Sequence, residues 1–173
     1  EQFDLSVELT GIEHFDIFLL NSPDVALSVI HKDEWRDHIR IAFSTLESLR
    51  QEGKISYWGI STLEGFKANE AGKAKLSLQE LQDLAQQAVG KDNGFKVIQF
   101  PYSLGMLDFL NAKVDDDMTL QQQLLAKGLF SISSLSLGQG QLISGLPKTL
   151  AEIMPETSSG AQRALQFARS TQG

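Results

Sequence analysis

Cysteine is absent from the 173-residue chain. Its absence excludes disulfide bonds, thiolate metal sites and a cysteine nucleophile, and it favours a reducing compartment. Apolar runs such as residues 17–20 are far shorter than the roughly 20 residues needed to cross a bilayer. The first residues also lack the basic and apolar stretches of a secretory signal. We therefore expect a cytoplasmic protein with no membrane partner.

Basic side chains are fewer than acidic ones, 15 against 22, which gives a formal net charge of −7. A domain with a pI of about 4.9 and no basic stripe repels polyphosphate, so we expect no nucleic-acid partner. Apolar residues make up 42% of the chain and charged residues 21%, as is typical of globular domains. The chain is therefore expected to fold around a hydrophobic core.

Metal sites and serine nucleophiles are not indicated by any motif. The chain has three histidines, and two of them, His31 and His38, are seven residues apart with no carboxylate pattern joining them. A Gly-x-Ser-x-Gly motif is also missing. We expect no bound metal and no serine-based catalysis.

Two periodicities alternate along the sequence. Short runs rich in β-branched and aromatic residues predict buried strands at 15–20, 55–60, 96–100 and 129–132. Apolar residues at helical spacing predict helices over 4–9, 33–52, 77–90, 119–128 and from about 159 onward. The expected helix starts are Ser77 with Glu80, Thr119 with Gln122, and Ser159 with Gln162. In the last helix we expect Ala161, Ala164, Leu165 and Ala168 to be buried.

Successive predicted strands begin 40, 41 and 33 residues apart, a spacing that suits strand-helix units. Right-handed crossovers would place the helices on one side of a sheet that curls into a barrel. The predicted fold is therefore α/β, a partial (β/α)8 TIM barrel with about four parallel strands each followed by a helix. Residues 1–173 are taken as a single, incomplete domain. An open, flavodoxin-like α/β domain of this length remains the alternative.

Function collects at the carboxyl ends of strands in both kinds of fold, and here those ends are polar. Asn21 ends the first predicted strand, Ser61 and Thr62 end the second, and Gln99 lies near the end of the third. Neutral amides and hydroxyls bind planar amides or sugars by directional hydrogen bonds, but they do not transfer protons at neutral pH. Gln99, inside an apolar run, must be hydrogen-bonded, either to a ligand or to a neighbouring backbone group.

Four segments, taken in chain order, resemble the aldo-keto reductases. Residues 15–23 (FDIFLLNSP) are similar to that family's fourth strand, and residues 42–62, through EGKI and WGIST, to its next helix and fifth strand. Residues 97–103 (VIQFPYS) resemble the sixth strand, and residues 136–140 (SLGQG) the loop after the seventh. The resemblance implies a divergent member, covering about the third to the seventh helix of the barrel.

The resemblance implies an NAD(P)-dependent oxidoreductase that passes a hydride between a nicotinamide and a carbonyl or alcohol substrate. The cofactor would be NADP or NAD, and the partner a small-molecule substrate. The positions that the resemblance assigns to the cofactor are Ser61, Thr62, Gln99, Ser134, Leu137, Gly138 and Gln139.

Departures from the family pattern fall at the chemically active positions. The family's catalytic tyrosine, lysine and aspartate belong to strands that this segment does not contain, and its histidine aligns with Asn21. Asparagine polarises a carbonyl by hydrogen bonding but relays no proton. Ser134 takes the place of the aromatic residue that stacks on the nicotinamide. We therefore expect the segment alone to be inactive.

Two interpretations stay open. The first is part of a genuine reductase, and the second is a non-catalytic scaffold of the same fold that binds a nucleotide or a partner, because a fold does not dictate function.

Overall fold

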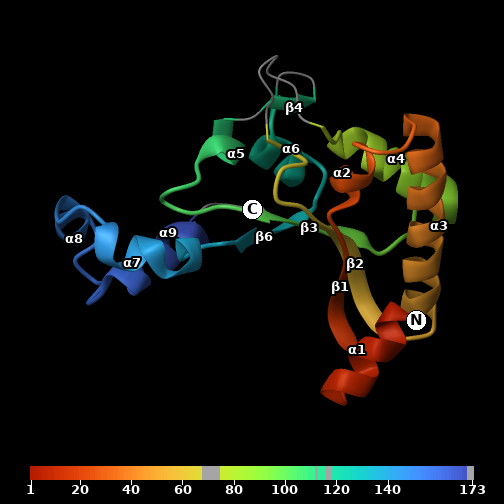
Figure 1. Ribbon diagram of the computed structural model, residues 1–173, viewed down its shortest axis with the longest axis horizontal. Coiled ribbons are helices and arrows are strands. Elements are labelled where there is room, and N and C mark those ends of the chain that lie inside the picture. The colour runs from red at the N-terminus through yellow and green to blue at the C-terminus, as the bar shows by residue number, and fades with distance from the viewer. Residues whose placement is uncertain (68–74, 112, 116–117, 171–173) are drawn as a thin grey trace.

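A sheet of four parallel strands forms the centre of the computed structural model, which describes residues 1–67, 75–111, 113–115 and 118–170. The strands are β1 (Phe15–Asn21), β2 (Ile55–Ser61), β3 (Phe95–Pro101) and β6 (Phe130–Ser134). They lie side by side in that order, as Figure 1 shows. All four predicted strands are present, with bounds within two residues of the expected ones. Their predicted burial is confirmed for β2 and β3 and is wrong for β1 and β6, which contain no buried residue.

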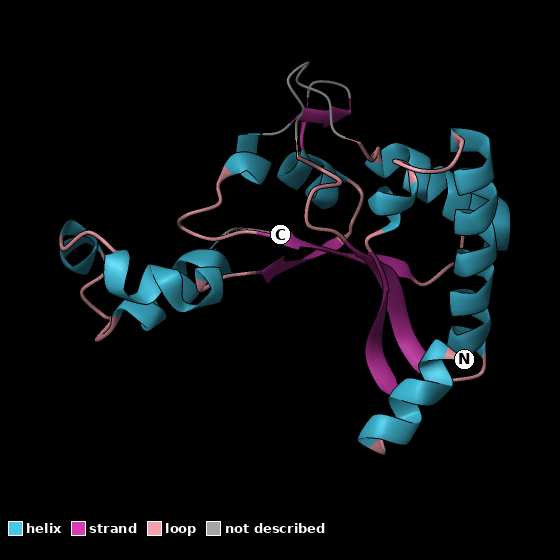
Figure 2. Cartoon of the chain, viewed as in Figure 1, coloured by secondary structure: helices cyan, strands magenta, loops and turns pink. Residues whose placement is uncertain are grey.

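The five predicted helices are also present. They are α1 (Gln2–Thr10), α3 (Lys32–Gln51), α4 (Leu78–Val89), α6 (Leu120–Ala126) and α9 (Gly160–Ser170). Five shorter helices were not predicted: α2 (Pro23–Ala26), α5 (Asp108–Asn111), the 3-10 turn η1 (Gly138–Gly140), α7 (Gln141–Gly145) and α8 (Thr149–Ile153). A small antiparallel pair, β4 (Lys113–Asp115) and β5 (Met118–Thr119), was missed as well. Figures 1 and 2 show α3, α4 and α6 on one side of a continuous sheet.

The order of the strands decides between the two predicted folds. Each strand of the described sheet lies beside the one that precedes it in the chain, with no reversal of direction along the sheet. A doubly wound, flavodoxin-like sheet requires such a reversal, because its helices cover both faces. The open flavodoxin-like alternative is therefore wrong, and the strands have the sequential order of a (β/α)8 barrel.

The two faces of the sheet differ in burial. Trp58, Ile60 and Ile98 point to one face and are fully buried. On the opposite face, Ile17 and Tyr57 are paired neighbours and are exposed, and Phe130 on β6 is 59% exposed. We call this second side, which carries Ile17, Tyr57 and Phe130, the open face.

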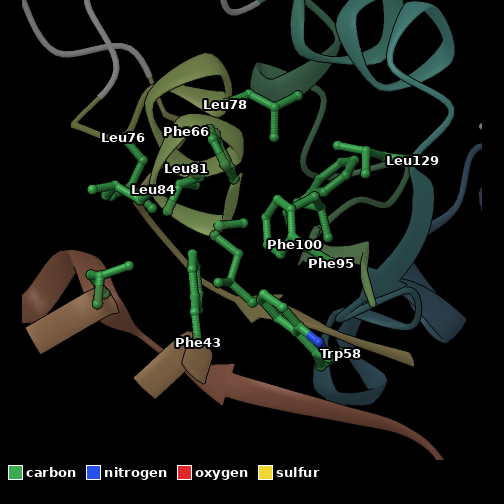
Figure 3. Packing of buried hydrophobic residues seen from close by; sticks show 14 of the residues in the cluster. Phe43, Trp58, Phe66, Leu76, Leu78, Leu81, Leu84, Phe95, Phe100 and Leu129 are labelled. Atoms are coloured by element: carbon green, nitrogen blue, oxygen red, sulfur yellow. The ribbon is translucent and has the colours of Figure 1, made fainter. Parts of the chain in front are cut away.

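The core lies between the buried face of the sheet and helices α3 and α4. The rings of Phe43, Trp58 and Phe95 contact one another, with centroids 4.8 to 5.4 Å apart. Figure 3 shows this group with Leu81 and other apolar side chains of the cluster. Each such side chain contributes about 1.5–3 kcal/mol when it is fully buried, so this layer fixes how the strands sit.

A buried carboxylate links α3 to the sheet. Glu47 is 2% exposed, and its Oε2 accepts hydrogen bonds from Trp58 Nε1 (2.8 Å) and the Gly94 N–H (2.9 Å). Its Oε1 accepts one from Arg50 Nη2 (2.6 Å). Burial alone would raise the pKa of the Glu47 carboxyl, but hydrogen bonds from Arg50, Gly94 and Trp58 outweigh burial and hold the pKa below its ordinary value.

Helix starts follow the predicted pattern with one correction. The side chain of Ser77 caps α4 by accepting from the Glu80 N–H (3.0 Å). The Glu80 carboxylate does not return to the cap, because it forms ion pairs with Lys32 (3.0 Å) and Arg36 (2.7 Å) of α3 instead. The predicted box at Thr119 has both of its hydrogen bonds. At the third predicted start, Ser159 Oγ accepts a hydrogen bond from the Gln162 N–H (3.2 Å).

The last helix is less buried than predicted. Ala164 of α9 is buried, as expected, whereas Ala161 and Ala168 are half-buried, and Ala168 packs against the core. Leu165 was expected to be buried and is 45% exposed, so that prediction was wrong. Within the described ranges, none of the helices combines the length and the apolar character that a bilayer span requires.

Candidate functional site

Three polar side chains lie in one row across the carboxyl ends of β1, β2 and β3. Asn21 is the paired neighbour of Ser61, and Ser61 is the paired neighbour of Gln99. All three side chains point to the open face, because residues two apart on a strand point the same way. We call Asn21, Ser61 and Gln99 the polar row.

A side-chain hydrogen bond joins two members of the row. Ser61 Oγ donates to Gln99 Oε1 at 2.7 Å, and both residues are half-buried. A serine hydroxyl has a single hydrogen, so Ser61 Oγ presents only lone pairs to a ligand, while the Gln99 amide presents two N–H donors. The row therefore offers an acceptor and a donor next to each other. Asn21 is exposed beside them.

Thr62, also assigned to the cofactor by the resemblance, lies apart from the polar row. It is 1% exposed, and its hydroxyl donates to Asp24 Oδ1 at 2.5 Å and accepts from the Gly65 N–H at 2.8 Å. Being next to Ser61 in an extended segment, it points away from the polar row. Asp24, which is 3% exposed, was not predicted as a site residue. Its only signal in the sequence was its place three residues after the strand-end Asn21.

Ser134, on the fourth strand β6, is the next of the predicted cofactor residues. Ser134 is paired with Pro101, and Ile132, two residues before it, is the partner of Gln99. Ser134 therefore lies one step beyond the polar row along the strand direction. Its carbonyl accepts a hydrogen bond from the Tyr102 N–H (3.1 Å).

The loop after β6 holds the other predicted cofactor positions, Leu137, Gly138 and Gln139, in a tight turn. Gln139 has a left-handed backbone (φ 55°), as do Gly138 (φ 54°) and Leu135 (φ 57°). For residues other than glycine this conformation costs of order 1–3 kcal/mol, and it is often found at functional sites. The Gly138 N–H donates to the Leu135 carbonyl (2.8 Å), and the Gly140 N–H to Leu137 (2.9 Å). These two amides are thus used within the loop.

A hollow of about 350 Å³ lies between this loop and the segment after β3. Gly138 and Gln139 line it together with Ser103, whose Oγ is buried and has no hydrogen-bond partner among the described residues. Buried hydroxyls normally have a partner, so this one has capacity for a water or a ligand. Among the described residues, no group of three or more histidine or acidic side chains is arranged to hold a metal ion.

Solved aldo/keto reductases share the fold of this sheet over about half of their length. An aldo/keto reductase from Klebsiella pneumoniae, solved with NADP and acetate, is 19% identical, with a TM-score of 0.60 over 95% of this chain and 48% of that chain. An aldo/keto reductase from Brucella melitensis is 16% identical, with a TM-score of 0.60 over 98% of this chain and 52% of that one. A putative 2,5-diketo-D-gluconic acid reductase B is 20% identical, with a TM-score of 0.59 over 98% and 48%.

The chain therefore spans about half the length of these solved structures. The model of the aldo/keto reductase family matches residues 1–106, more than half of the chain, and the chain belongs to the aldo/keto reductase family. No curated protein gives a significant match.

Proposed function

We propose that the whole protein is an NAD(P)-dependent oxidoreductase of the aldo-keto reductase type, which transfers a hydride between a nicotinamide and a carbonyl or alcohol substrate. The polar row at the carboxyl ends of β1, β2 and β3 carries this proposal, and membership of the family supports it. In this proposal, residues 1–173 form one incomplete barrel domain that is inactive by itself, because the proton donor lies on other strands.

Ser61 and Gln99 would hold the nicotinamide carboxamide. The Ser61 oxygen is free to accept the carboxamide N–H, and the Gln99 N–H groups are free to donate to the carboxamide oxygen. Uncharged donors and acceptors suit this neutral, planar group. Ser134, Leu137, Gly138 and Gln139 would line the nicotinamide and the pyrophosphate. Thr62 would act on the site through its contact with Asp24. The bound cofactor supplies the hydride, and the protein orients it.

Asn21 is the proposed polarising group of this segment. Its exposed amide can donate a hydrogen bond to the substrate carbonyl oxygen, which gains negative charge as the hydride arrives. An amide does not release a proton at neutral pH, so Asn21 cannot also protonate that oxygen.

The cofactor is NADP or NAD, and NADP is favoured because the Klebsiella pneumoniae relative was solved with it. A cytoplasmic location and the absence of a nucleic-acid partner stay predictions from the sequence.

The direct test is carbonyl reduction by the whole protein, followed as loss of NADPH absorbance with a panel of aldehydes and ketones. We expect turnover that depends on both the cofactor and the carbonyl compound. Retained NADPH binding with no turnover on any compound would instead support the second candidate, a non-catalytic scaffold of the same fold. Asn21 and Ser134 favour that candidate, because neither provides the proton relay or the stacking ring of the family pattern.

A further inference from the structure

Asp24 is a buried acidic residue at the edge of the polar row. It lies in the first turn of α2, just after β1, and only 3% of its surface is exposed. Its Oδ1 accepts the hydroxyl hydrogen of Thr62, which directly follows β2. The hydrogen bond thus joins the turns that follow two neighbouring strands.

Further hydrogen bonds make this junction rigid. The Ser22 N–H donates to the Ser61 carbonyl (2.6 Å), and the Thr62 N–H donates to the Gln99 carbonyl (3.0 Å). On the other side, Trp35 Nε1 of α3 donates to the Pro23 carbonyl at 2.8 Å and fixes the start of α2. Ser22, held between these contacts, has a left-handed backbone with φ 48°.

The orientation of Thr62 depends on Asp24. If the Thr62 hydroxyl turned to the open face, the Asp24 carboxylate would lose this donor while remaining buried, and the Gly65 N–H would lose its acceptor. A buried polar group without its partner is costly. Thr62 is therefore kept below the row, while Asn21 and Ser61, at the ends of β1 and β2, belong to the row itself.

We infer that Asp24 is a positioning residue, which acts through Thr62 to hold Asn21 and Ser61 side by side for the nicotinamide and the substrate carbonyl. This inference rests on the proposed function. Thr62, in turn, supports the site from beneath rather than binding the carboxamide itself.

The first experiment tests the Asp24–Thr62 contact without any cofactor. Hydrogen exchange of the Gly65 N–H, followed by NMR, should become at least about tenfold faster in Thr62→Val, which keeps the side-chain volume and removes the hydroxyl. Thr62→Ser, which keeps the hydroxyl, should restore slow exchange. Thr45→Val is the matched control, because the exposed Thr45 hydroxyl donates to the Ile41 carbonyl within α3, away from the Asp24–Thr62 contact. Equal Gly65 exchange in all variants would overturn the inference.

The second experiment measures ligand binding by the whole protein. NADPH should bind about tenfold more weakly to Thr62→Val and to Asp24→Ala than to the wild type. Its affinity for Thr62→Ser should lie within about twofold of the wild-type value. Asp24→Asn, which keeps an acceptor oxygen, should lie close to wild type. The probe 2′-phospho-ADP-ribose lacks the nicotinamide, so its affinity should be the same in every variant.

The outcomes separate the inference from the proposed function. If both ligands weaken equally in the variants, the role is merely structural and the inference is wrong. The inference also fails if wild type binds NADPH and no variant differs from it. A wild-type protein that binds no NADPH contradicts the proposed function and removes this role for Asp24, even if the Gly65 exchange shows that the contact exists.

Discussion

Individual polar side chains link the α3 helix and the strand ends of this protein to neighbouring elements. Glu47 binds α3 to β2 and to the turn before β3 by accepting hydrogen bonds from Trp58 and Gly94. Its other oxygen accepts from Arg50 of the same helix. Its place was not predicted, because a glutamate in the middle of an amphipathic helix normally faces solvent. Gly94 explains its burial: a Cβ there would lie 2.5 Å from Arg50 Cδ, so the absence of a side chain lets the Gly94 N–H reach the carboxylate.

Replacing Glu47 with glutamine should lower the free energy of unfolding at neutral pH by about 1–3 kcal/mol, since charged hydrogen bonds become neutral ones. The pKa of Glu47 is held below its ordinary value of 4.5. The stabilisation from the carboxylate is therefore complete above 4.5 and is lost as the pH falls through the lower, folded-state pKa. Urea unfolding of both proteins at falling pH measures the difference, which should shrink below pH 4.5.

Glu64→Gln is the control for this prediction, because the Glu64 carboxylate is exposed and pairs with exposed Lys67 at 3.7 Å. It should change stability by less than about 1 kcal/mol at any pH. A stability difference between wild type and Glu47→Gln that stays constant with pH would show that the Glu47 charge does not matter.

Replacing Gln99 with leucine tests the polar row at a single residue. The change removes the acceptor of Ser61 and the proposed carboxamide donor, while volume is nearly kept. We expect NADPH to bind the whole protein at least about tenfold more weakly. Stability should change by only about 1 kcal/mol, because Gln99 is half-buried and Ser61 remains accessible to water. Gln86→Leu, at an exposed position of α4, is the control, and equal NADPH affinities in both variants would contradict the assignment.

At the scale of elements, the sequence predicts the helices and strands that have a clear hydrophobic period or a capping residue. Strands β1, β2, β3 and β6 are short runs rich in apolar residues, although only β2 and β3 contain buried ones. Helices α3, α4 and α6 combine apolar stripes with starts or stops at Ser77, Thr119 and Gly53. The short elements between β3 and α9 have neither signal: α7 and α8 are five residues each with no buried side chain, and β5 has two residues. Contacts between distant segments shape them.

The residues of the site also fall into those that the sequence predicts and those that it does not. The positions of Asn21, Ser61 and Gln99 follow from strand ends and alternation, which the sequence shows. The burial of Thr62 does not, because it depends on Asp24, 38 residues away in the chain.

Gly59 on β2 provides a prediction at the scale of strand packing. A Cβ there would lie 1.7 Å from the Val97 carbonyl oxygen of β3, where the pairing of the two strands shifts in register. Gly59→Ala must push β2 and β3 apart, so we expect a loss of about 3 kcal/mol or more in the free energy of unfolding. Gly145→Ala, at the end of α7 with no atom within 4 Å of the new Cβ, is the matched control. Similar thermal unfolding of both variants would contradict this account of the sheet.

At the scale of the whole molecule, the described sheet has open edges. Strands β1 and β6 each have only one neighbour in the described sheet, and Ile17, Tyr57 and Phe130 are exposed on the open face. Natural proteins usually cover such edges and faces. The polar row belongs to the same open face. In the proposed whole protein, the strands that cover this face would also bring the catalytic tyrosine, lysine and aspartate to the row.

A crystal structure of the whole protein with NADP tests the central claim most directly. The account predicts further strands that close the barrel around the open face, with the carboxamide nitrogen within hydrogen-bonding distance of Ser61 Oγ and its oxygen within that distance of the Gln99 amide. A nicotinamide bound away from Asn21, Ser61 and Gln99, or a sheet that stays open along β1 and β6, would contradict it.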